Sequence, residues 1–224
     1  MIQSNKIFII GLPRTATTSL SVAMLELGFK TAHTAYTYQC FQQAEVIADT
    51  PVFYDYPSLD KIYPNSRFIY LERDLIQWRP SIRQLLKRMS KNLLVANGGF
   101  NPVIKRCFTE VFSPFNLTNL ESDDFLTACY QKHRSHVLTY FKNRPDDLLI
   151  LKLADSNSFL QLIEFLKLDD ISTAQIQSGF KPINIAGKVT AWNQIKHPLK
   201  IESTRNGKID KIDYQKLTFE NGTK

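Results

Sequence analysis

The chain has 224 residues, 43% of them hydrophobic and 22% charged, and its formal net charge is +7. These proportions suit a globular protein with one large domain, or a domain with an appendage. Its three cysteines, Cys40, Cys107 and Cys129, are widely spaced and form no CxxC pair, which argues against a disulfide framework and a zinc site. We expect a cytoplasmic protein without a membrane span or a bound metal.

Strands and helices alternate along the predicted elements. Residues 6–10 form an apolar run typical of a strand buried on both faces, and the run enters a turn at Gly11. A helix is predicted from Thr18 to Leu27, before a glycine placed to end it. Further strands are expected at 51–54 and 67–71, and another buried strand at 147–153. A turn or helical segment is expected at 57–63, and helices over 37–48, 74–94, 123–142 and 156–168, the last behind a serine cap. This order predicts a three-layer α/β/α fold with a central parallel sheet, in which ligands bind at the carboxyl ends of the strands.

The last part of the chain is the more basic part. Residues 171–224 hold nine Lys or Arg and four acids. We divide the chain into an α/β domain over 1–170 and a small C-terminal extension over 171–224. The extension could cover a bound nucleotide and form a hairpin around Asn206-Gly207.

The turn after the first strand reads Gly-Leu-Pro-Arg-Thr-Ala-Thr-Thr-Ser over residues 11–19. A loop between a strand and a helix can aim backbone N–H groups at the oxygens of a phosphate. Against the Walker pattern GxxxxGK[ST], Gly11 and Thr18 match, but Ala16 replaces the second glycine and Thr17 replaces the lysine. Kinases and ATPases use that lysine on the transferred phosphate, so the sequence disfavours γ-phosphoryl transfer.

The same loop is suited to a phosphosulfate group bound without a metal. Its candidate ligands are Arg14, Thr15, Ala16, Thr17, Thr18 and Ser19. Residues 13–18 resemble the 5′-phosphosulfate loop of the sulfotransferase family, usually Pro-[Lys/Arg]-[Ser/Thr]-Gly-Thr-[Ser/Thr], with Ala16 in place of the glycine. The resemblance covers about residues 6–168 and implies the P-loop NTPase-like fold of bacterial-type sulfotransferases. It also implies in-line transfer of a sulfuryl group from 3′-phosphoadenosine 5′-phosphosulfate (PAPS) to a hydroxyl or amine, with adenosine 3′,5′-bisphosphate as product.

A second motif of the family binds the 3′-phosphate of the donor. In that motif an arginine ends a strand and a serine follows eight residues later, and Arg73 and Ser81 reproduce this spacing. A guanidinium can hold a phosphate bidentately. The alternative is the solvated face of an amphipathic helix, which we favour for Arg79 and the basic residues after it. Many members also cover the nucleotide with a basic, glycine-containing loop, for which Lys188 is the candidate here.

The base that accepts the acceptor's proton is left open between two residues. In the family it is a histidine just after a strand and close to a proline, and Asp55 falls at that place. An aspartate there would need burial near the site to act as a base at neutral pH. His33 titrates near neutrality and could serve instead, or the two could share the work. Arg14 is the expected catalytic cation for the leaving phosphate. His133 and His136 lack a third ligand nearby, so we interpret them as surface or core residues.

The acceptor is not identified by the sequence. Residues 95–122 are rich in turn formers and aromatics and are predicted to line its pocket. We expect a small molecule or a saccharide and no nucleic acid. Two other classes stay open, a P-loop nucleotide kinase and a non-catalytic module that binds nucleotide or nucleic acid through its positive charge.

Overall fold

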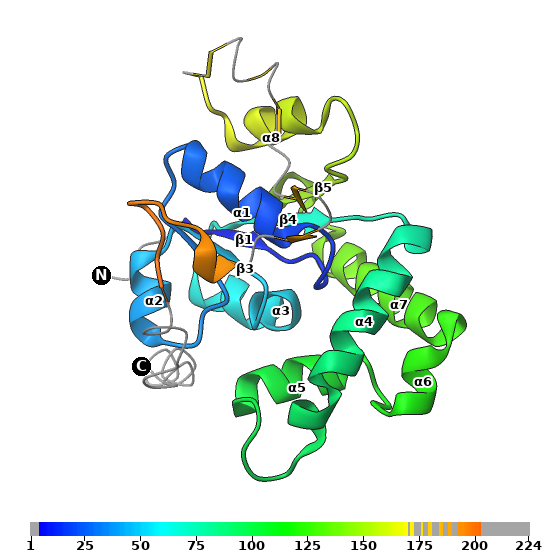
Figure 1. Cartoon of the computed structure of the whole chain (residues 1–224). Helices are drawn as coiled ribbons and strands as arrows, with labels where there is room; N and C mark the ends of the chain where they lie inside the picture. Colours follow the sequence, from blue (N-terminus) through cyan, green and yellow to red (C-terminus); the bar gives the residue numbers. More distant parts are fainter. Residues whose placement is uncertain are drawn as a thin grey trace.

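The computed structural model describes residues 5–169, 171–172, 176, 179–180, 184–185, 188–189 and 192–202. Its centre is a parallel sheet of five strands in the order β2-β3-β1-β4-β5 (Figure 1). The strands are β1 (Ile7–Ile9), β2 (Thr31–His33), β3 (Val46–Ala48), β4 (Arg67–Leu71) and β5 (Leu148–Leu151). The predicted parallel α/β sheet is therefore confirmed.

Helices cover both faces of this sheet. They are α1 (Thr17–Glu26), α2 (Tyr38–Gln43), α3 (Val52–Ile62), α4 (Leu75–Leu94), α5 (Pro102–Val111), α6 (Leu117–Glu121), α7 (Asp123–Phe141) and α8 (Ser158–Leu166). Figure 1 shows α1 and α8 on one side of the sheet and α2 and α3 on the other. Side chains alternate across a strand, so Ile7 and Ile9 join the core under α1 and α8, whereas Phe8 joins the larger core under α3, α4 and α7. The short elements are η1 (Pro145–Asp147), β6 (Asn184–Ile185), β7 (Lys188–Val189) and η2 (Trp192–Gln194).

The region between α1 and β4 differs from the prediction. The strand expected at 51–54 is wrong, because these residues open helix α3, and the helix expected over 37–48 stops at Gln43 and is followed by β3. Strand β2 was not predicted. Both β2 and β3 have three residues, too few for a periodic pattern, and their strand form depends on pairing with their neighbours.

Two further expectations need correction near β5. The strand is present, but it is the last of the sheet, and Ile150 is 39% exposed rather than buried. An edge strand lacks a neighbour on one side, which leaves part of its face open to water. Helix α8 begins with Ser158, and the residue before it, Asn157, makes no side-chain capping hydrogen bond, so the predicted serine cap is wrong.

Part of the C-terminal extension packs against the opposite edge of the sheet. Thr31 of β2 forms a parallel bridge with Lys200. The Thr31 N–H donates to the Leu199 carbonyl at 3.1 Å, and the Ile201 N–H donates to the Thr31 carbonyl at 2.9 Å. The hairpin predicted around Asn206-Gly207 lies outside the described residues, and the division of the chain at residue 170 stays a prediction.

Candidate active site

The loop between β1 and α1 has the backbone form of an anion-binding site. A Cβ on Gly11 would lie 2.7 Å from both Leu71 Cβ and Thr15 Oγ1, so only glycine fits beside β4. Arg14 (φ 72°) and Ala16 (φ 76°) are left-handed on either side of Thr15, an alternation that turns successive N–H groups toward one point. Helix α1 then begins without a side-chain cap. Its first N–H groups have no partner within the helix, which leaves them free for an anion.

Helix α4 and Arg73, which lies just before it, hold this loop in place through three hydrogen bonds. The Trp78 indole N–H donates to the Pro13 carbonyl at 3.0 Å, and Arg73 Nη1 donates to the Arg14 carbonyl at 2.8 Å. Arg14 Nε in turn donates to Ser81 Oγ at 2.8 Å. The structure therefore brings together Arg14, Arg73 and Ser81, the three residues that the two sequence motifs predicted separately.

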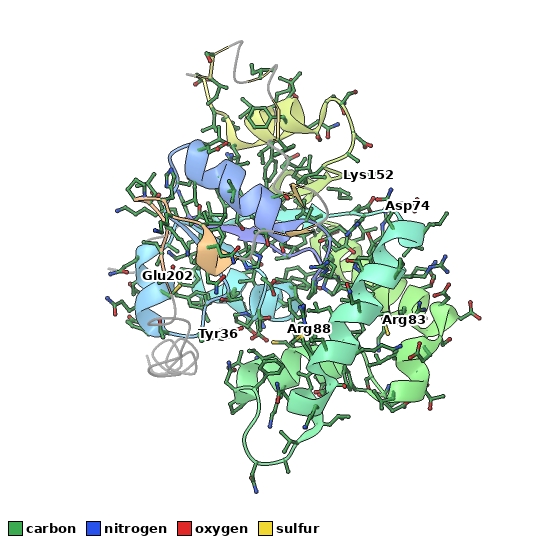
Figure 2. All side chains as sticks on the ribbon, viewed as in Figure 1. Tyr36, Asp74, Arg83, Arg88, Lys152 and Glu202 are labelled. Atoms are coloured by element: carbon green, nitrogen blue, oxygen red, sulfur yellow. The ribbon has the colours of Figure 1, made fainter. Side chains whose placement is uncertain are left out.

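Positive charge accumulates around Arg14. Its pKa is lowered by burial first and then by the charges of Arg73 and Arg88, with Asp49 opposing. Arg88 is exposed, as a solvated helix face predicts, but it follows Ser81 by seven residues and so shares its face of α4. Figure 2 shows it between α3 and α4. Arg88 was assigned from the sequence to the solvated face of the helix, and its spacing from Ser81 was the signal that it also lies on the side of Arg14.

The basic residues elsewhere on α4 behave differently, because they pair with acids of α6 and α7. These pairs are Arg79 with Asp123, Arg83 with Asp123 and Lys87 with Glu121. Within the described part of the chain, no ion pair with an acid is formed by Arg14, Arg73 or Arg88. Three guanidinium groups without acidic partners, beside an open helix N-terminus, can bind a polyanion.

A hollow of about 230 Å³ opens beside Arg73 at the carboxyl ends of β4 and β5. Its lining includes Tyr130, whose hydroxyl accepts a hydrogen bond from the Arg73 N–H at 3.0 Å, and Lys152, which Figure 2 shows near Asp74. Arg134, another lining residue, is held by Glu72 at 2.6 Å. The hollow leaves room for a ligand beside Arg73.

His33 lies at the carboxyl end of β2 and faces the loop. Its Nε2 lies 3.1 Å from Thr17 Oγ1 and 3.2 Å from Thr18 Oγ1. The same atom lies 3.5 Å from Oδ2 of Asp49. Burial lowers the pKa of His33, and the Asp49 charge acts in the opposite direction. The structure thus connects the predicted base His33 directly to two hydroxyls of the phosphate loop.

Asp49 is a functional candidate that sequence reasoning missed. It comes directly after β3, and the register of the sheet places His33 opposite Ala48, so the two side chains meet at the carboxyl edge. Its Oδ1 accepts from the Thr50 N–H at 2.7 Å. The signal was present as Asp-Thr-Pro after the apolar run Val-Ile-Ala, but assigning that run to a helix concealed it. Nearby, burial and the Asp49 charge raise the pKa of Tyr36, which Figure 2 labels.

Asp55 lies away from this group, in the first turn of α3. The premise that it follows a strand is wrong. Its two carboxylate oxygens accept from Arg106 at 2.7 and 2.6 Å. The pair lines a cavity of about 500 Å³ between α3, α5 and α7, and none of the lining residues belongs to the phosphate loop or is His33 or Asp49. Asp55 as the base stays a prediction that the geometry does not favour.

The two histidines of α7 line the same cavity. His133 is buried, and its Nε2 donates to the Phe53 carbonyl at 2.7 Å. Burial lowers the pKa of His133 to about 4, so the ring is neutral at pH 7. His136 is exposed. Their interpretation as a core residue and a surface residue is confirmed, and the described residues contain no group of three or more His, Cys, Asp or Glu that could hold a metal ion.

The remaining predicted ligands differ in what the structure says of them. The buried Thr15 hydroxyl donates to the Leu12 carbonyl at 2.7 Å and so shapes the loop. Ser19 lies in the first turn of α1. Lys188 belongs to β7, but its side chain lies outside what the structure describes. Residues 95–122 hold α5 and α6, and their role in acceptor binding stays a prediction.

Comparison with known families agrees with this fold and loop. The sulfotransferase domain family matches the chain over residues 6–39 and 34–172. The match spans most of the chain, so the protein belongs to the sulfotransferase domain family and is a transferase by class. No curated protein matches it. In the described part of the chain, no helix is both long enough and apolar enough to cross a membrane.

Proposed function

We propose that this protein transfers a sulfuryl group from PAPS to a hydroxyl or amine of an acceptor. The observation that carries the proposal is the convergence of Arg14, Arg73 and Ser81 beside the open N-terminus of α1. Among the residues that the structure describes, no acid forms an ion pair with either guanidinium group. The 5′-phosphosulfate would bind at the loop, and the 3′-phosphate at Arg73 and Ser81. Two separate anions on one nucleotide require two such positions.

The loop argues against the kinase alternative. At the place of the Walker lysine stands Thr17, whose hydroxyl lies 3.1 Å from His33 rather than carrying a charge toward a γ-phosphate. Phosphoryl transfer depends almost wholly on charge positioned at the transferred group. A leaving 5′-phosphate of PAPS develops its charge at the loop itself, where Arg14 and the α1 N-terminus can stabilise it.

We assign proton acceptance to the His33–Asp49 pair. In the in-line step the acceptor oxygen or nitrogen forms a bond to sulfur, the bond from sulfur to the 5′-phosphate oxygen breaks, and that oxygen keeps the electron pair. The acceptor's proton passes to the pair, which lies against the phosphate loop through Thr17 and Thr18. Asp55 is less suitable because Arg106 occupies both of its oxygens.

Two further parts of the site are proposed from the sequence. From the family resemblance we propose Lys188 of the C-terminal extension as a nucleotide ligand, and we propose that helix α5 and the loops around it line the acceptor pocket. For the acceptor we propose a small molecule or a saccharide. The positive charge near Arg14 suits the donor, so it is no argument for a nucleic acid.

Calorimetric titration with adenosine 3′,5′-bisphosphate tests the donor site. 5′-AMP and Mg·ATP serve as comparators at physiological salt. We expect micromolar, metal-independent binding of the bisphosphate in clear preference to both, since only this ligand carries both anions. Tighter binding of Mg·ATP than of the bisphosphate would favour the alternative that the protein is a nucleotide kinase. Bisphosphate binding without sulfuryl transfer to any acceptor in a panel of phenols, alcohols, amines and saccharides would favour a non-catalytic module.

A further inference from the structure

The segment 192–202 lies beyond the region that matches the family, which ends at residue 172, yet it reaches the candidate active site. Its hydrogen bonds to Thr31 attach it to the free edge of β2, the strand that ends at His33. At the start of the segment, the ring of Trp192 stacks on the His33 ring, with 5.5 Å between centroids and 29° between planes.

Lys200 holds Trp192 in this place. Its ammonium donates to the carbonyls of Trp192 at 2.9 Å and Ile195 at 3.0 Å, and it lies 5.2 Å from the centroid of the Trp192 ring. Glu202 pairs with the same ammonium at 2.5 Å. The Lys200 side chain is 5% exposed, so these contacts are largely shielded from water. Backbone and side chain together fix the indole over the imidazole.

His33 is thereby confined on two sides. Its Nε2 edge faces Thr17, Thr18 and Asp49, and its face is covered by the indole, which leaves the residue 9% exposed. An imidazole without a stacking partner can rotate about χ2, whose energy wells are broad, and would then lose this alignment.

We infer that Trp192 is a positioning residue of the transfer reaction, which clamps His33 against the phosphate loop and Asp49. The inference rests on the proposed function of that pair. It makes part of the C-terminal extension a component of the active site, although the family match does not include it. Trp192 itself need not touch either substrate.

Removing the indole should change how His33 titrates. The charged or titratable groups of this region are Asp49, which faces the ring, Arg14 and Tyr36, which interact electrostatically with Asp49, and Lys200 beside the indole. Burial is the largest cause of the lowered pKa of His33. Without the indole, water reaches the ring, so the pKa rises toward its ordinary value and the acid limb of the activity profile moves to higher pH.

The test compares Trp192→Ala with Trp192→Phe in the full chain. We expect Trp192→Ala to lower kcat about tenfold through lost alignment and to shift the acid limb of the kcat–pH profile upward, while the donor KM and the bisphosphate Kd change less than about twofold. Trp192→Phe should recover most of kcat and the wild-type profile, because it keeps an aromatic face. An unchanged profile in Trp192→Ala, or a loss that the phenylalanine does not rescue, overturns the inference.

A readout independent of activity separates this inference from the proposed function. The His33 imidazole can be followed by NMR titration, its signal assigned among the four histidines with His33→Gln. We expect its pKa to rise in Trp192→Ala whatever the protein transfers. A wild-type protein that binds no bisphosphate contradicts the proposed function, whereas an unmoved His33 titration contradicts the clamp.

Discussion

Two regions of the molecule each combine an aspartate with a histidine, and they differ in what surrounds the aspartate. Asp49 faces His33, which touches the hydroxyls of the phosphate loop. Asp55 is held through both oxygens by Arg106, beside a histidine that donates to a backbone carbonyl. In the first region the histidine lies against the phosphate loop and Oδ2 of the aspartate faces the histidine, whereas in the second region Arg106 occupies both oxygens of the aspartate. Hydrogen-bond partners therefore distinguish a candidate base from a structural acid more reliably than position along the chain.

The largest expected effect comes from replacing the aspartates and the histidine that distinguish the two regions. Asp49→Asn and His33→Gln should each reduce kcat by about 10²- to 10⁴-fold, the usual contribution of a general base. Asp55→Asn should change kcat less than about threefold, since it lies in the other region. Turnover is measured with radiolabelled PAPS at saturating donor. If Asp55→Asn loses turnover and Asp49→Asn keeps it, the roles of the two regions must be exchanged.

The long elements of the fold were predictable from the sequence, whereas the pairing at the active site was not. Strand β4 has five residues and leads into a twenty-residue amphipathic helix, so the spacing from Arg73 to Ser81 could be placed correctly. Strands β2 and β3 have three residues each, and their strand form depends on neighbours distant in sequence. The meeting of His33 with Asp49 follows from that register, so a local pattern could indicate that Asp49 follows a strand but not that it faces His33. The same holds for Trp192, which reaches His33 from the far end of the chain.

The buried histidine of the second region, His133, should make the folded protein less stable in acid. Burial lowers the pKa of His133 from 6.5 to about 4, so the unfolded chain binds this proton more readily than the folded one. Stability is then lost as pH falls from 6.5 toward 4, by about 3 kcal/mol at ~1.4 kcal/mol per pKa unit. Urea denaturation at pH 7 and pH 4 measures the loss.

His133→Gln is the matched variant for this measurement. It keeps an N–H for the Phe53 carbonyl but cannot be protonated. We expect it to flatten the pH dependence of the unfolding free energy without abolishing it, because burial also lowers the pKa of His33 and acts with the same sign. A variant as acid-sensitive as the wild type would show that His133 does not control this transition.

The next effect is smaller and concerns nucleotide affinity, for which Arg73 and Arg106 should differ. Arg73→Ala should weaken bisphosphate binding by about 1.5–3 kcal/mol more than it weakens 5′-AMP binding, the scale of hydrogen bonds to a charged group. Some loss is expected for 5′-AMP as well, because Arg73 also donates to the Arg14 carbonyl of the phosphate loop. Arg106→Ala should change neither affinity, because its guanidinium is committed to Asp55. Calorimetric titration of each variant with each nucleotide measures these affinities. Equal losses of affinity for the two nucleotides in Arg73→Ala would contradict the assignment of Arg73 to the 3′-phosphate.

The smallest expected effect concerns the residue at which the loop departs from the family pattern. Ala16 is left-handed (φ 76°), and so is Lys167 (φ 57°) at the end of α8, far from the loop in sequence. A non-glycine residue in the left-handed conformation destabilises the folded state by about 1–2 kcal/mol, and glycine removes this strain. Glycine also gives the unfolded chain more conformational entropy, which offsets about 0.5–1 kcal/mol of the gain. Ala16→Gly and Lys167→Gly should therefore each raise the unfolding free energy by about 0.5–1 kcal/mol. Because both variants keep the same backbone form, bisphosphate affinity should not change in either. A loss of affinity in Ala16→Gly alone would mean that the alanine stiffens the loop for its ligand, so that the strain at this position serves binding.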